Sequence, residues 1–290
     1  MRLLLALLFL AFPAAAETVA LDGRSYRIDL PADPVGAPLI VMLHGGGGSP
    51  DQSAAKTGLS TAALPLGYAV AYPQGTGRLA TWNGGYCCGA AARRGVDDLG
   101  FLDQVVADAT ARFGLDGTRV FAAGMSNGAI MAETWAAARP DRLAAVAAVA
   151  GSMDAARVTV QGRVPLLIIH GTADRQVPYA GGQGEDSRVP TAFSPVTAVR
   201  DAFLAPWGPV VRAQGLRGGD GARIRTDDYI AGTGQLALRL VTIDGGGHVW
   251  PGFLRAVPPR NPPEEPPFSA TAEVLEFFGQ VGAAGRQGLP

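Results

Sequence analysis

Lysine is almost absent from this chain of 290 residues, since Lys56 is the single lysine among 24 basic residues. The arginines are scattered and form no basic run or stripe, and the formal net charge is −1. Nucleic-acid-binding proteins usually gather basic residues on one face or segment, so the composition gives little support to that function. With 48% hydrophobic and 17% charged residues, the chain has enough apolar side chains for the core of one large α/β domain.

Long apolar runs are also missing, because no segment reaches the roughly 18 uninterrupted apolar residues of a membrane-spanning helix. A shorter run, 3–12, follows Arg2, and Ala14-Ala15-Ala16 forms a small-residue cleavage site before Glu17. This arrangement is typical of a cleaved secretory signal. We expect residues 1–16 to be a signal peptide. Residues 17–290 should then form one exported domain, extracellular or periplasmic and without membrane insertion.

Cysteine is scarce as well, since only Cys87 and Cys88 occur and they are adjacent. In an oxidising compartment such a pair can close a vicinal disulfide, which constrains a local turn. The alternative is two free thiols packed in a glycine-rich loop. Two adjacent cysteines lack the spaced partners of a zinc site.

Apolar runs that suit buried strands recur along the first 170 residues, after a hairpin predicted around Asp22-Gly23. They occupy 38–43, 67–72, 120–123, 145–150 and 165–169. Helices are predicted between them at 49–64, with Ser49 as the N-cap, at 99–113, begun by Asp97 and Asp98, and after residue 126 until Pro140. This alternation predicts an α/β fold with a mostly parallel central sheet and helices on both faces, a three-layer sandwich.

Beyond residue 172 the pattern is less regular. A loop over the sheet edge is expected at 179–195, and the proline-rich stretch 258–267 resists regular structure. The remaining predicted elements are a helix at 195–205, paired strands at 223–230 and 235–242, and a closing helix at 269–281.

A G-x-S-x-G pentapeptide occupies 124–128, between a predicted strand and a predicted helix. The pentapeptide alone is common, but this setting is the one that a nucleophile elbow requires. Gly124 and Gly128 are small enough for the close approach of strand and helix, and the helix N-terminus favours negative charge near Ser126. The alternative is an ordinary glycine-rich turn.

His44 begins a run of four glycines directly after the strand 38–43. In α/β-hydrolases the loop at this place supplies a backbone N–H to the oxyanion hole, and the residue after the nucleophile supplies a second. Gly46 and Asn127 are therefore the candidate donors. A phosphate-binding loop would need G-K-[ST] or G-x-G-x-x-G, and neither follows.

A serine nucleophile needs a base in contact with it and a third group that orients the base. The chain has three histidines, and in this fold the order is nucleophile, acid, histidine. His44 precedes Ser126, and His170 precedes any plausible acid, so His248 remains as the candidate base.

The acid is expected just after a strand, at the carboxyl edge of the sheet. Asp174 follows the strong apolar strand 165–169 and satisfies this condition. Asp244 is the best rival, but it lies four residues before His248 on the same turn and would have difficulty facing Nδ1. Catalysis by a serine, a histidine and an aspartate needs no metal, and we expect no metal and no cofactor.

With these residues placed, the chain resembles the secreted esterases of the polyhydroxybutyrate depolymerase and feruloyl esterase group, a family with the α/β-hydrolase fold. The motifs that carry the resemblance, in chain order, are LHGGGG at 43–48, WNGGYCCG at 82–89, VDDLGF at 96–101, GMSNGA at 124–129, IHGTAD at 169–174 and GGGHVWPG at 245–252. The resemblance implies that Ser126, Asp174 and His248 form a catalytic triad.

The resemblance also suggests Trp250 as a wall of the substrate site, although core packing beside the His248 loop is an equal alternative. Trp82 and His44 are further substrate-binding candidates. The expected substrates are hydroxyalkanoate oligomers or polyester, or alternatively feruloyl or acetyl groups on plant polysaccharide. A peptidase of the same fold is also compatible with the sequence, and so is an exported binding protein on an inactive hydrolase scaffold. We expect a monomer.

Overall fold

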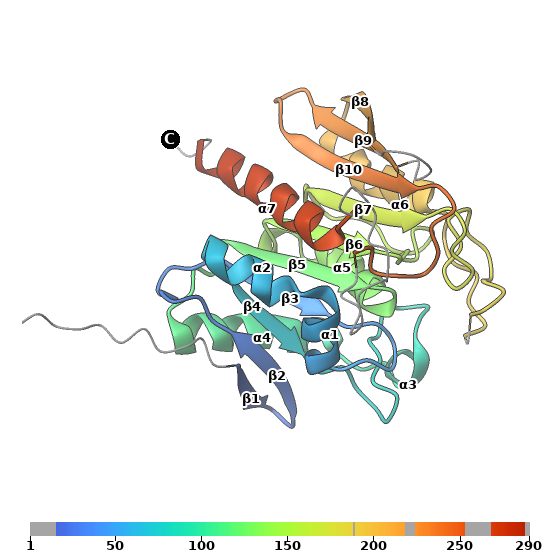
Figure 1. The fold of residues 1–290 in the computed structure, drawn as a ribbon. Helices are drawn as coiled ribbons and strands as arrows, with labels where there is room; N and C mark the ends of the chain where they lie inside the picture. Colours follow the sequence, from blue (N-terminus) through green and yellow to red (C-terminus); the bar gives the residue numbers. More distant parts are fainter. Residues whose placement is uncertain (1–15, 188, 218–223, 253–267, 288–290) are drawn as a thin grey trace, which may run out of the picture.

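The computed structural model describes residues 16–187, 189–217, 224–252 and 268–287 (Figure 1). Residues 1–15 of the expected signal peptide and the proline-rich stretch 258–267 lie outside the described residues. None of the helices within the described ranges is long and apolar enough to cross a membrane.

A single twisted sheet runs through the described part of the molecule, in the order β1-β2-β4-β3-β5-β6-β7-β10-β9-β8 (Figure 1). Neighbours from β4 to β10 are parallel, and the outer strands on both sides are antiparallel. The strands are β1 (Glu17–Leu21), β2 (Arg24–Asp29), β3 (Leu39–Leu43), β4 (Ala69–Pro73), β5 (Val120–Met125), β6 (Ala145–Val149), β7 (Leu166–Gly171), β8 (Val210–Arg217), β9 (Ile224–Ala231) and β10 (Leu236–Ile243).

Helices cover both faces of the sheet. One layer holds α4 (Asp98–Phe113), α5 (Asn127–Ala138) and α6 (Val196–Leu204), and the other holds α1 (Pro50–Thr57), α2 (Leu59–Ala63) and α7 (Ala270–Gln287). A short helix, α3 (Gly89–Arg93), lies in the loop after β4. The predicted mostly parallel three-layer fold is confirmed.

Strand β3 shows why its sequence is continuously apolar. Leu39, Val41 and Leu43 join the core beneath α4 and α5, whereas Ile40 and Met42 join the core beneath α2 and α7. Because successive side chains point to opposite faces, a strand covered on both sides must be apolar throughout.

Two local predictions need correction. The helix expected at 49–64 is interrupted, because Gly58 takes a left-handed φ of +62° and ends α1 before α2 begins. The predicted N-cap is correct, since Ser49 Oγ accepts a hydrogen bond from Gln52 N. The edge strand β8 was not predicted, because Gly215 and mixed polar residues obscure its alternation.

Candidate active site

Ser126 lies at the sharp turn between β5 and α5, with φ +56° and ψ −124°. Such strained backbone at a serine is the signature of a nucleophile elbow. A Cβ on Gly124 would lie 2.3 Å from Gly128 O, and a Cβ on Gly128 would lie 2.2 Å from Leu43 O. Glycine is therefore required at both positions for the strand, the turn and the helix to approach this closely.

The turns that carry the acid and the base are tied to each other. Strands β7 and β10 are parallel neighbours, so their carboxyl ends meet at one edge of the sheet. Ala173 N donates to Gly246 O at 2.9 Å, and a Cβ on Gly171 would lie 2.1 Å from the same oxygen. This close packing brings Asp174 and His248 together from positions 74 residues apart.

His248 bridges the serine and the aspartate. Its Nε2 lies 2.9 Å from Ser126 Oγ, and its Nδ1 lies 2.7 Å from Asp174 Oδ2. Because the carboxylate only accepts, Nδ1 carries the proton and donates it, which leaves the Nε2 lone pair free to accept from the hydroxyl. The three side chains selected from the sequence thus form a continuous hydrogen-bonded chain.

Asp174 is buried and well supplied with donors. Its Oδ1 accepts from the backbone N–H groups of Gln176 and Val177 at 2.8 and 2.9 Å. Burial opposes ionisation, but hydrogen bonds from His170 and His248 outweigh it and hold the pKa of Asp174 well below its ordinary value. The carboxyl is therefore ionised at neutral pH, as a group that orients and stabilises an imidazolium must be.

Two backbone donors lie free beside the serine. Within the described chain, the N–H groups of Gly46 and Asn127 donate to no protein acceptor. The two residues are close, since a Cβ on Gly46 would lie 3.9 Å from Asn127 Cβ, and a Cβ on Gly45 would lie 3.5 Å from Ser126 Cβ. These unused donors suit an oxyanion that forms next to Ser126.

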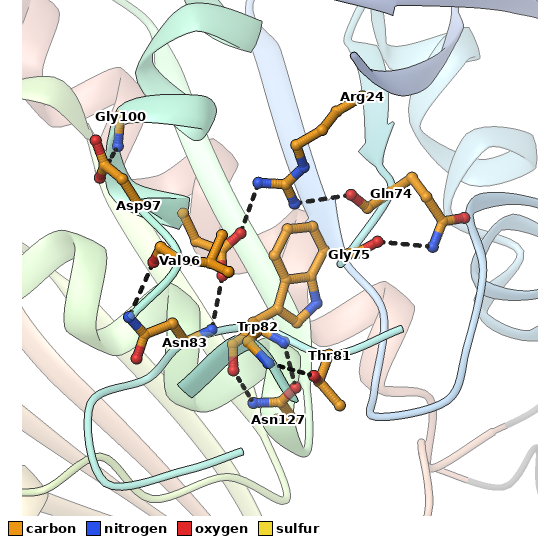
Figure 2. A network of polar contacts seen from close by, with 12 residues as sticks. Arg24, Gln74, Gly75, Thr81, Trp82, Asn83, Val96, Asp97, Gly100 and Asn127 are labelled. Atoms are coloured by element: carbon orange, nitrogen blue, oxygen red, sulfur yellow. Dashed lines mark hydrogen bonds and ion pairs between the residues drawn. The ribbon is translucent and has the colours of Figure 1, made fainter. Parts of the chain in front are cut away.

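The side chain of Asn127 points away from this site, toward the loop after β4. It accepts from Trp82 N and donates to Trp82 O, as Figure 2 shows. Asp98 anchors the same loop further along the chain. Its carboxylate accepts hydrogen bonds from Arg24 Nη1 at 2.7 Å and from Asn83 N at 2.7 Å. Asp98 was predicted only as a helix-start residue, and its ion pair with Arg24 across 74 residues left no local signal.

Comparison with known proteins agrees with this geometry. Residues 24–161 match the family model described as Esterase PHB depolymerase. The proposed esterase NocK of Nocardia uniformis subsp. tsuyamanensis is 32% identical over 265 residues, which are 82% of this chain and 74% of NocK. The chain belongs to the esterase PHB depolymerase family.

Two fungal proteins are also similar to this esterase family member. Feruloyl esterase B of Piromyces equi is 29% identical over 223 residues, 73% of this chain and 39% of that protein. The bifunctional acetylxylan esterase/xylanase XynS20E of Neocallimastix patriciarum is 25% identical over 163 residues, 56% of this chain and 23% of that protein. The chain spans well under half of either fungal protein. Its family and these relatives make it a carboxylic ester hydrolase.

Solved structures share the fold of this esterase. The acetyl xylan esterase from Aspergillus awamori superposes with a TM-score of 0.61 at 16% identity, over 91% of this chain and 99% of that chain. TT1662 from Thermus thermophilus gives a TM-score of 0.50 at 20% identity, over 81% and 90%. At these identities the likeness concerns the α/β-hydrolase fold, which was the predicted fold class.

Trp82 and His44, two of the expected substrate-binding residues, are buried and hydrogen-bonded to neighbouring loops of the esterase. Trp82 is 0% exposed, and its indole Nε1 donates to His44 O at 2.9 Å. His44 is 3% exposed, and its Nδ1 and Nε2 are both occupied, by Gly45 O and Gly75 N. Burial of both side chains favours a role in packing, and their expected contact with substrate stays a prediction.

Trp250 is likewise buried, at 3% exposure, among the side chains that pack against α7. Its indole donates to Thr271 Oγ1 at 3.0 Å, and that hydroxyl donates to Thr57 O. Of the two roles considered from the sequence, core packing is the one that the structure supports. The role of Trp250 as a wall of the substrate site stays a prediction.

Cys87 and Cys88 are joined as a vicinal disulfide in the structure. Cys87 packs in a small apolar cluster with Ile130, which lies one turn beyond Ser126 on α5, and with Val177, which follows Asp174. The cysteine pair therefore belongs to the packing around the esterase site.

Two buried titratable residues near the site were not predicted to matter. Glu133 lies on α5 at 0% exposure and accepts from Met153 N with Oε2. His170 was set aside by chain order, yet its Nε2 lies 3.4 Å from Asp174 Oδ2. Only the folding of the 171–177 turn back over β7 brings this histidine to the acid, so no sequence pattern could have assigned it there.

Proposed function

We propose that this chain is a secreted serine carboxylesterase that hydrolyses esters through Ser126, His248 and Asp174 by way of an acyl-enzyme. The observation that carries the proposal is the continuous hydrogen-bonded chain from Ser126 Oγ through His248 to Asp174 Oδ2, at 2.9 and 2.7 Å. These distances lie within the range of a working nucleophile, base and orienting group.

In the first half of the reaction, His248 Nε2 takes the proton of Ser126 as Oγ attacks the ester carbonyl carbon. The carbonyl oxygen becomes an oxyanion, which the N–H groups of Gly46 and Asn127 stabilise. His248 then returns the proton to the departing alkoxide, the C–O bond breaks, and an alcohol leaves. Each such oxyanion donor typically contributes about 3 kcal/mol of transition-state stabilisation.

In the second half, water takes the place of the alcohol. His248 removes a proton from the water, whose oxygen attacks the acyl carbon, and the same two N–H groups stabilise the second oxyanion. Transfer of the proton to Ser126 Oγ releases the acid and restores the serine. Asp174 stays ionised throughout, in line with its lowered pKa, and stabilises the imidazolium in both steps.

For the substrate we propose hydroxyalkanoate oligomers or polyester, in keeping with the family described as Esterase PHB depolymerase. A second candidate is a feruloyl or acetyl group on plant polysaccharide. The names of the fungal relatives, a feruloyl esterase and an acetylxylan esterase/xylanase, favour this second candidate.

Export follows from the N-terminal sequence. We propose cleavage between Ala16 and Glu17, after the small residues Ala14-Ala15-Ala16 and directly before β1. The mass of the mature protein recovered from the periplasm and from the culture medium tests both the cleavage point and the final compartment.

A panel of esters tests the substrate class. Purified mature protein is assayed on p-nitrophenyl acetate and butyrate, methyl ferulate, acetylated xylan and hydroxybutyrate oligomers, with Ser126→Ala as the matched control. Preference for the oligomers supports the first candidate, and preference for ferulate or acetylxylan supports the second. Equal turnover by Ser126→Ala would contradict the mechanism. Absence of turnover on every ester, together with an unreactive serine, would favour an inactive exported binding protein.

A further inference from the structure

His170, near the end of β7, lies beneath the turn that carries Asp174. Its side chain is fully buried. Nε2 lies 2.8 Å from Val177 O and 3.4 Å from Asp174 Oδ2. One ring nitrogen thus faces two oxygens, one on the catalytic acid and one three residues further along the same turn.

The partners of Nε2 fix where its proton lies. A backbone carbonyl and an ionised carboxylate can only accept hydrogen bonds, so Nε2 must carry a proton. It donates this proton to Val177 O at 2.8 Å, and Asp174 Oδ2 lies 3.4 Å from the same nitrogen. The other nitrogen, Nδ1, is buried and has no partner within the described chain. The ring also packs edge to face against Tyr179, with the ring centroids 5.8 Å apart. His170 therefore acts through a single polar atom, which is directed at the Asp174 turn.

This donor completes the environment of the Asp174 carboxylate. Oδ1 is held by the N–H groups of Gln176 and Val177, and Oδ2 receives His248. Without His170, Oδ2 would lose the positive end of an N–H dipole 3.4 Å away, and Val177 O would lose its side-chain partner. His170 thus restrains the rotation of the carboxyl group and the shape of the turn together.

We propose that His170 is a positioning residue for the esterase reaction, which keeps Asp174 Oδ2 aimed at His248 Nδ1. The proposal rests on the proposed function of Asp174 as the acid of the triad. Within the described residues, His170 forms no hydrogen bond or ion pair with the serine or the oxyanion donors, so its effect on the reaction passes through Asp174 and the turn that carries it. A buried histidine that only fills space would leave the properties of His248 unchanged.

Two substitutions separate these roles. His170→Gln keeps an N–H donor near the position of Nε2, whereas His170→Leu keeps the volume and removes the donor. Tyr179→Phe serves as the matched control, because it perturbs the same cluster by removing a hydroxyl that contacts Thr242 Oγ1. Turnover of p-nitrophenyl butyrate and the thermal unfolding midpoint are measured for all three, and kcat/KM is measured across pH.

For His170→Leu we expect kcat to fall about ten- to a hundredfold, the cost of a misplaced catalytic group, with KM within about twofold of the wild type. The acid limb of the pH profile should move to higher pH. Asp174 then has one donor fewer to neutralise its charge, and it holds the proton on His248 more strongly. His170→Gln should recover most of the activity and the original limb, and Tyr179→Phe should match the wild type. Equal losses for Gln and Leu, or an unmoved acid limb, would overturn the proposal.

A measurement on the unmodified protein covers the case in which His170→Leu does not fold. The chain has three histidines, so long-range 1H–15N spectra of histidine-labelled protein resolve each ring. The proposal requires a protonated Nε2 on His170, and an unprotonated Nε2 would overturn it. The protonation state of His170 is measured without turnover. Failure of the proposed triad would be detected separately, as esterase activity that remains in Ser126→Ala.

Discussion

Both polar atoms of the Asn127 side chain form hydrogen bonds with the backbone of one residue, Trp82. Trp82 N donates to Oδ1 at 2.7 Å, and Nδ2 donates to Trp82 O at 3.0 Å. The backbone N–H of the same asparagine is one of the two proposed oxyanion donors. Asn127 therefore ties the long loop after β4 to the turn at Ser126, and the shape of that loop is linked to the position of the proposed oxyanion donor.

Replacement of Asn127 by alanine should destabilise the protein and lower its activity. The change leaves the N–H of Trp82 buried without a partner, at a cost of about 1–3 kcal/mol, whereas Trp82 O keeps the hydrogen bond from Cys88 N at 3.0 Å. Urea unfolding gives the loss of stability, and turnover of p-nitrophenyl butyrate gives the loss of activity. Asn83→Ala is the matched control, because Asn83 makes two hydrogen bonds in the same loop but is partly exposed. Equal losses in both variants would contradict the role of Asn127.

Gly128→Ala should be among the most damaging single changes in the chain. Its Cβ would lie 2.2 Å from Leu43 O, a backbone atom that cannot move without displacing β3 and the oxyanion loop. We expect a loss of about 3 kcal/mol or more in the free energy of unfolding, together with loss of activity. In Gly232→Ala the added Cβ meets nothing within 4 Å, and the change should be close to neutral. A stable and active Gly128→Ala protein would argue against a tightly packed elbow.

The central strands and the elbow could be predicted from sequence because their signals are local. Doubly covered strands are apolar throughout, and the small residues around Ser126 are a direct consequence of close packing. The helix break at Gly58 was harder to predict from the sequence, because glycine is tolerated inside many helices and only the structure shows its left-handed φ.

Asp174 and its rival Asp244 offer a direct test of the proposed acid. Asp174 Oδ2 lies 2.7 Å from His248 Nδ1, whereas Asp244 Oδ1 accepts from Thr172 Oγ1 at 3.2 Å. Asp174→Asn should lower kcat by on the order of 10³- to 10⁴-fold, because the imidazole loses the partner that fixes its tautomer. Asp244→Asn should keep nearly full activity. Reversal of the two results would transfer the role to Asp244.

Glu133 predicts a specific pH dependence of stability. Burial raises the pKa of its carboxyl to about 8, and the hydrogen bond from Met153 N opposes this only in part. In the unfolded chain the pKa is about 4.3. The folded protein therefore binds this proton more tightly. The stabilising contribution is fully present below the unfolded pKa and is lost as the pH rises through about 8.

Glu133→Gln should remove this dependence, because the amide stays neutral at every pH. Relative to the variant, the wild type should lose several kilocalories per mole of stability between mildly acidic and mildly alkaline solution. Urea unfolding of both proteins across that range measures the difference. A difference that stays constant with pH would show that Glu133 is ionised in the folded protein.

The residues around the triad were harder to predict than the triad itself. Trp82 was expected at the substrate site, and Trp250 either there or in the core, because aromatic side chains beside a catalytic motif can serve a pocket or the core. The burial of both rings favours the core. His170 was eliminated by chain order, a rule that identifies the base but not a residue that supports the acid. Contacts of this kind depend on how the loops at the sheet edge fold over one another.

The most direct test of the account is covalent labelling of the folded enzyme with a fluorophosphonate probe, followed by peptide mapping. An activated serine is required for the reaction, so the account predicts one adduct, on Ser126, with loss of esterase activity in proportion to labelling. His248→Ala should label far more slowly than the wild type. An unlabelled protein that still hydrolyses esters, or an adduct on another serine, would contradict the assignment of Ser126 as the nucleophile.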